Sequence, residues 1–233
     1  MIYFSYPFQE NWHFIIDEEK YVEYSSVYTS SLHLLVSMVN TFEYNTDRDL
    51  SVIATNSSGP VYFNQSNHII LNLENKDNIE QMVFQLSHEM CHYFLDRGLK
   101  NGNLKWFEEV ICTICSHYFL NILGPSWEKS SIDFLKFAGK SMPVYSFRNL
   151  LEKDEVPLTS SLTYERYDRQ KNNYVVSKLI PIFFSNPTLW RDVPKLSEIN
   201  SDTIADLLNK WENISLPNNK PAIAKIRSCF DYD

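Results

Sequence analysis

Two histidines four residues apart, His88 and His92 in the segment QLSHEMCHYF, constrain this chain more than any other feature. On a helix, residues four apart project side by side, so two imidazole nitrogens can reach one metal ion. Glu89 is rotated about 100° away from that line, so it can reach a water bound to the metal rather than the metal itself. The segment therefore predicts either a zinc site with its catalytic base or two core histidines that are satisfied by other hydrogen-bond partners.

The residues around this pair predict a buried helix. Asp77 and Glu80 form a start that resembles a capping box, and Gly98 is placed to end the helix. The face that carries the two histidines is apolar, and a helix that is apolar nearly all round is buried. The main apolar stripe recurs at the helical period and consists of Ile79, Met82, Val83, Leu86, Met90, Tyr93 and Phe94.

The next predicted helix, which runs from about residue 104 to the Gly124-Pro125 pair, offers a third donor. Two adjacent carboxylates, Glu108 and Glu109, begin it. The face of Glu109 carries only small residues, so it can approach a neighbouring helix closely; these are Cys112, Thr113 and Ser116. Glu109 is therefore the better candidate for a metal ligand, whereas Glu108 is explained as an acidic residue in a first helical turn, which the helix dipole favours.

Together, HEMCH at 88–92 and WFEE at 106–109 resemble the gluzincin zinc metallopeptidases, in many of which the third ligand lies in a Trp-aromatic-x-Glu stretch on the following helix. The resemblance covers residues 68–123. Thr113 stands where many members carry an Asp that orients a zinc-binding histidine. The chain is also similar, more weakly, to cytoplasmic regulatory proteases of the ImmA/IrrE type.

The resemblance implies a zincin fold that binds Zn²⁺ through His88, His92 and Glu109, with water in the fourth position and Glu89 as the catalytic base. It also implies an edge strand along the cleft, above the motif helix. HIILNLEN, at 68–75, stands where that strand is expected. An exposed strand edge can bind an extended peptide through main-chain hydrogen bonds. A further oxyanion donor is usual in this family, and the possible suppliers are Tyr164, Tyr167 and Tyr174.

Hydrophobic patterning predicts an α+β chain. A zincin-like domain is expected over residues 1–125, followed by a mostly helical part over 126–233 that walls the cleft. In the first part, a helix is predicted near residues 17–42, and strands are predicted in LSVIAT (50–55), PVYF (60–63) and HIILNLEN. Helical breaks in the second part are expected near Pro143, Pro157, Pro181 and Pro187.

Composition narrows the class of protein. The 233 residues are 44% hydrophobic and 15% aromatic, which indicates a globular chain with a real core. The formal charge of −8 argues against binding to nucleic acid or to acidic membrane lipids. No apolar run is long enough to span a membrane, and the N-terminus lacks signal-peptide features. We therefore predict a cytoplasmic protein.

The four cysteines make no secreted disulfide pattern, which fits a reduced protein; they are Cys91, Cys112, Cys115 and Cys229. Cys112 and Cys115 are best explained by core packing, because a free cysteine behaves as a small hydrophobe. Cys112 shares the face of Glu109 and is a second candidate for a metal neighbour. The other histidines show no ligand-type spacing; they are His13, His33, His68 and His117.

Two functions follow from these patterns. The first is a zinc-dependent metallopeptidase that acts on a peptide or protein substrate. The second is a non-catalytic zinc-containing module that binds a partner protein. Glu89 favours the peptidase, because a purely structural zinc site has no use for a carboxylate beside an open coordination position.

Overall fold

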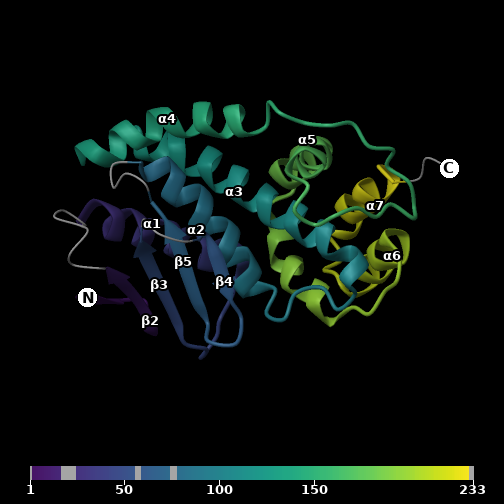
Figure 1. Cartoon of the computed structure of the whole chain (residues 1–233), viewed down its shortest axis with the longest axis horizontal. Helices are drawn as coiled ribbons and strands as arrows, with labels where there is room; N and C mark the ends of the chain where they lie inside the picture. The colour runs from purple at the N-terminus through teal and green to yellow at the C-terminus, as the bar shows by residue number, and fades with distance from the viewer. Residues whose placement is uncertain (1, 17–24, 56–58, 74–77, 231–233) are drawn as a thin grey trace.

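The computed structural model describes residues 2–16, 25–55, 59–73 and 78–230 and shows the predicted α+β architecture (Figure 1). An N-terminal half contains a mixed sheet with its helices, and the C-terminal half is mostly helical. Within the described residues, no helix is both long and apolar enough to cross a membrane.

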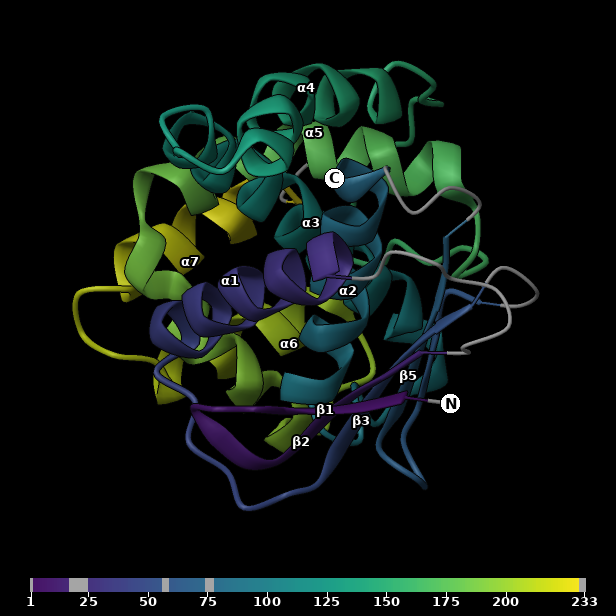
Figure 2. The same cartoon turned by 90° about the vertical axis from the view of Figure 1, so that its left-hand side faces the viewer.

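The sheet has the strand order β1-β2-β3-β5-β4. Its central strands β2, β3 and β5 are parallel, while β1 and β4 pair antiparallel at the two ends of the sheet. Helices α1 and α2 lie over one face (Figure 2). The strands are β1 (Ile2–Tyr6), β2 (Gln9–Ile16), β3 (Leu50–Thr55), β4 (Val61–Phe63) and β5 (His68–Asn72).

The predicted strands 50–55 and 60–63 are present, the second as Val61–Phe63. Burial alternates along β3 and β5, so that Val52 and Ile69, which are register partners, both have 0% exposure. This period of two is the reason why one sheet face could be read from the sequence. The first two strands, β1 and β2, were not predicted.

The prediction that 68–75 forms the edge strand is wrong. The segment does form a strand over 68–72, but β4 folds back onto it as an antiparallel hairpin, with Val61 opposite Ile70 and Phe63 opposite His68. Hairpin formation covers the edge of β5 and leaves β4 as the outer strand. Residues 74–75 lie outside the described part of the chain.

The helices of the second half continue through two of the predicted breaks. Pro143 lies inside α4 and Pro181 inside α5, because packing against α3 keeps both helices continuous despite the lost backbone hydrogen bond. Pro157 lies in the irregular segment before α5, and Pro187 begins η2, so those two breaks are confirmed. The helical segments are α1 (Ser25–Phe42), α2 (Ile79–Phe94), η1 (Gly102–Leu104), α3 (Lys105–Trp127), α4 (Asp133–Asn149), α5 (Arg169–Ser185), η2 (Pro187–Glu198), α6 (Ile204–Ile214) and α7 (Lys220–Ser228).

The predicted ends of two helices also need correction. Helix α2 ends before Gly98: Leu95 is its C-cap, and Asp96 takes the left-handed conformation that follows, at φ 53°. Asp77 lies outside the described residues, and Asn78 is the N-cap. Helix α3 continues two residues beyond Pro125, although the proline cannot donate the backbone hydrogen bond of its position.

The predicted division at residue 125 falls within α3. The hydrophobic core is continuous from the sheet to the C-terminal helices, and its members include Trp12, Trp106 and Trp211. Small side chains bring α2 and α3 together, as predicted, since the Ser116 hydroxyl donates to the Phe84 carbonyl at 2.9 Å. The assignment of two domains stays a prediction.

A buried histidine makes this core sensitive to acid. His117 on α3 is fully buried, and its Nδ1 lies 2.9 Å from the Ser146 hydroxyl. Burial, together with the nearby charge of Arg169, lowers the pKa of His117 to about 3. The folded protein therefore holds this imidazole neutral, whereas the unfolded chain protonates it below about pH 6.5.

We predict that His117 contributes stability above about pH 6.5 that is lost as the pH falls towards 3, at up to about 1.4 kcal/mol per pH unit. The free energy of unfolding, measured by urea titration at several pH values, should therefore depend less steeply on pH in His117→Asn than in the wild type. Parallel pH curves for the two proteins would contradict this assignment.

Candidate metal centre

Helices α2 and α3 place three donors of the predicted site against one another. Glu109 Oε2 lies 3.2 Å from His88 Nε2 and 3.7 Å from His92 Nε2. Oxygen and nitrogen ligands at about 2.0–2.2 Å from a tetrahedral zinc ion are roughly 3.3–3.5 Å apart. Both separations are close to this value, and the carboxylate contacts the two imidazoles directly.

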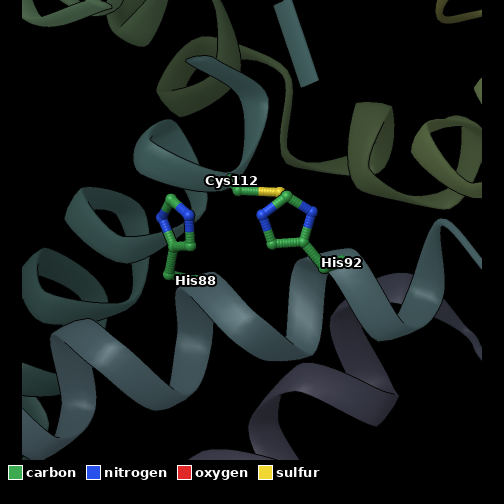
Figure 3. A group of neighbouring side chains, drawn as sticks. All are labelled: His88, His92 and Cys112. Atoms are coloured by element: carbon green, nitrogen blue, oxygen red, sulfur yellow. The ribbon is translucent and has the colours of Figure 1, made fainter. Parts of the chain in front are cut away.

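Cys112 is a further donor at this position, as Figure 3 shows. One ligating atom from each of His88, His92 and Cys112 lies within 4.8 Å of the other two, so this group could hold a metal ion. The two histidines are partly buried and the cysteine has 0% exposure. Cys112 follows Glu109 by one helical turn, which places both side chains on the side of α3 that faces α2.

Glu108 orients one of the histidines. Its Oε1 lies 2.9 Å from His92 Nδ1, and its Oε2 accepts from the Leu99 amide and from Lys105 Nζ, each at 2.8 Å. Burial alone would raise the pKa of Glu108, but hydrogen bonds from His92 and Lys105 lower it to about 2. The ionised carboxylate can only accept, so His92 donates from Nδ1 and presents Nε2 to a metal.

Glu108 does lie in the first turn of α3, as predicted, and this contact gives its side chain a second role. Its side chain is buried at 6% exposure and supplies the outer partner that Thr113 does not provide. The Thr113 hydroxyl instead donates to the Glu109 carbonyl of its own helix at 2.8 Å. The sequence signal was Glu108, the first acid of the WFEE stretch, whose direction depends on how α3 packs.

Gly98 makes room for that carboxylate. Its φ is +67°, and a Cβ added there would lie 2.5 Å and 2.6 Å from the two oxygens of Glu108 and 2.7 Å from Lys105 Nζ. These distances are far below van der Waals contact. Gly98 is therefore required by the approach of Glu108, and it does not end α2.

Arg166 hydrogen-bonds to the other carboxylate, that of Glu109, and its role was not predicted from the sequence. Its Nη2 and Nε donate to Glu109 Oε1 at 2.7 Å and 3.2 Å, which leaves Oε2 directed at the histidines. Burial raises the pKa of Glu109, but the hydrogen bonds to His88 and His92 outweigh it, so the net shift is downwards. No spacing could have indicated Arg166, because it lies 57 positions along the chain from Glu109.

The neighbouring carboxylates favour the protonated form of His92. Burial opposes its charge, yet the hydrogen bonds to Glu108 and Glu109 raise the pKa of His92 well above its usual value. A metal must displace this proton, because only the neutral imidazole can be a ligand. Metal affinity at this site should therefore fall as the pH falls.

The site opens into a cleft of about 490 Å³. Glu89 lines this cleft beside His88 and His92 although only 6% of it is exposed. The outer strand β4 contributes Val61 and Tyr62 to the opposite wall. The sequence prediction that a strand lies beside the site is thus correct in kind, with β4 in place of β5.

Of the three tyrosines considered as oxyanion donors, Tyr167 lines the cleft and packs under the Arg166 guanidinium, 4.4 Å from ring centroid to Cζ. The Tyr164 hydroxyl donates to Asn172 at 2.9 Å.

Cys115 is fully buried, as core packing predicts.

Comparisons with protein-family models, with curated proteins and with solved structures find no significant match for the chain. The case for a metal site therefore rests on the side chains themselves. His88, His92 and Cys112 form a buried group that could hold a metal ion, and the carboxylates around them are arranged as metal ligands and their partners commonly are.

We predict that Gly98→Ala weakens metal binding about 10–100-fold, because the added methyl displaces Glu108 and releases His92. Glu108→Gln should weaken binding in the same direction. Gly102→Ala is the matched control, since a Cβ there meets nothing within 4 Å. Calorimetric titration with Zn²⁺ measures all three affinities. Unchanged affinity in folded Gly98→Ala would show that Glu108 does not position His92.

Proposed function

We propose that this protein is a zinc-dependent metallopeptidase of the gluzincin type. In this proposal His88, His92 and Glu109 bind the metal, and Glu89 is the catalytic base. The observation that carries it is the convergence of Glu109 Oε2 on both Nε2 atoms, with Glu89 lining the adjoining cleft.

A bound zinc ion would activate a water molecule and polarise the carbonyl of the scissile peptide bond. Glu89 follows His88 directly, so its carboxylate projects to one side of the histidine pair and into the cleft. There it can accept the proton of the attacking water and pass it to the leaving amine. Arg166 keeps Glu109 ionised and correctly directed, and Glu108 does the same for His92.

The substrate class that suits this cleft is an extended peptide. Strand β4 pairs with β5 along one side, and among the described residues no strand pairs with its other side. Main-chain groups on such an edge can bind a peptide as an added strand. Gln85 on α2 anchors the neighbouring strand β5, because its side chain hydrogen-bonds to the backbone N–H and C=O of Asn72 at 2.9 Å and 2.8 Å.

A second candidate function is a non-catalytic metal-containing module that binds a partner protein. Cys112 favours it, because two histidines, a carboxylate and a thiolate would close a tetrahedral site with four protein ligands, as structural zinc sites usually are. Such a module would use the cleft for recognition and leave Glu89 without a chemical role.

We predict that Glu89→Gln keeps the fold and the bound zinc but lowers peptide hydrolysis by about 10²–10⁴-fold, because it removes the base and leaves every metal ligand in place. Hydrolysis of an unstructured protein such as casein, followed by release of amino groups, measures the effect. Glu80→Gln, on the same helix, is the matched control and should match the wild type. Equal rates for wild type and Glu89→Gln would end the peptidase proposal and favour the binding module.

We also predict that His92→Ala no longer retains zinc through gel filtration, because it leaves only His88 and Glu109 of the three ligands proposed here. Metal analysis of the purified variant, with circular dichroism to show that it is folded, tests this. A full equivalent of zinc in folded His92→Ala would place the metal elsewhere.

A further inference from the structure

We propose that Cys112 is a ligand of the bound metal and that it closes the site in the resting protein. This inference rests on the proposed function, since it concerns regulation of the same centre. The thiolate would complete a set of four protein donors with His88, His92 and Glu109. Hydrolysis would then require the thiolate to leave the metal.

The position of the sulfur supports this role. Its distance to the nearest ligating nitrogens of His88 and His92 is at most 4.8 Å, and in Figure 3 the side chain of Cys112 points from α3 towards the two imidazole rings. Nitrogen and sulfur ligands on one tetrahedral zinc are roughly 3.5 Å apart, from bonds of about 2.0 and 2.3 Å. Movements of about an ångström would bring the sulfur to that separation.

Burial makes the thiol different in kind from the other donors. Cys112 has 0% exposure and lies within the α2–α3 interface, whereas His88, His92 and Glu109 line the cleft. The thiol therefore approaches from the protein interior, and water and substrate approach from the cleft. Soft thiolate ligands bind zinc strongly, so a sulfur at this position competes with water for the fourth place.

Ligation of the metal by Cys112 involves no redox change. The S–H bond of Cys112 breaks as the sulfur binds the metal, the proton passes to solvent and no electron is transferred. A divalent cation favours the ionised form of a thiol that coordinates it, so the thiolate is stabilised in the buried interface.

Cobalt substitution tests the ligand directly. Co²⁺ bound to a thiolate shows an intense sulfur-to-metal charge-transfer absorption in the near ultraviolet, which nitrogen and oxygen ligands do not produce. We expect this absorption in the Co²⁺-loaded wild type and its loss in Cys112→Ala. Cys115→Ala is the matched control, because it makes the same change one turn along α3 at an equally buried position, and it should retain the absorption.

Hydrolysis supplies the second readout. If the thiolate closes the site, zinc-loaded Cys112→Ala should cleave casein faster than the wild type, while Cys115→Ala should match the wild type. Wild-type protein that binds one Co²⁺ without the charge-transfer absorption would overturn the inference. So would an absorption that survives in Cys112→Ala, or measurable hydrolysis at the same rate in Cys112→Ala and the wild type.

The outcomes separate this inference from the proposed function. A protein that binds no Co²⁺ or Zn²⁺ at all contradicts both. One equivalent of Co²⁺ without the charge-transfer absorption, together with hydrolysis that depends on Glu89, contradicts only the role of Cys112. The absorption with no hydrolysis by the wild type or by Cys112→Ala identifies Cys112 as a ligand in a non-catalytic module.

Discussion

The contact between two adjacent carboxylates of α3 and two histidines of α2 is the interaction on which the site depends. Glu108 and Glu109 are both buried, and an unpaired buried carboxylate would cost several kcal/mol. Each carboxylate therefore forms ion pairs with more than one side chain. Glu108 pairs with His92 and Lys105, and Glu109 pairs with the histidines and Arg166. Removal of any partner leaves a charge unsatisfied, so the donors are held in position before a metal arrives.

The same pairing accounts for the charge balance of this cluster. The hydrogen bonds to Glu108 and Glu109 raise the pKa of His92, and Arg166 supplies a fixed positive charge to Glu109. The two buried carboxylates are thus matched by cationic partners within the protein. A metal ion bound by the proposed ligands would compete with the proton on His92.

The walls of the cleft are tied together by a second cluster, centred on Arg48. Its Nη2 donates to the Tyr62 hydroxyl of β4 at 2.8 Å, and its Nη1 donates to the Tyr93 carbonyl at the end of α2 at 3.2 Å. The guanidinium also lies over the Tyr93 ring at 4.4 Å and pairs with Asp96 at 2.9 Å. Arg48 therefore joins the outer strand to the helix that carries the histidines.

Local periodicity was enough to predict much of this protein, and only tertiary packing decided the rest. The spacing of His88 and His92 on a buried helix, and the small-residue face of Glu109, follow from helical geometry that any neighbouring sequence obeys. The partners of those groups depend on contacts between segments far apart in the chain: Arg166 on Glu109, and β4 folded over β5. Even Glu108, beside a predicted ligand, takes its role from the space that Gly98 leaves. Such contacts are determined by how whole helices and strands pack against one another, and a local sequence pattern does not indicate that packing.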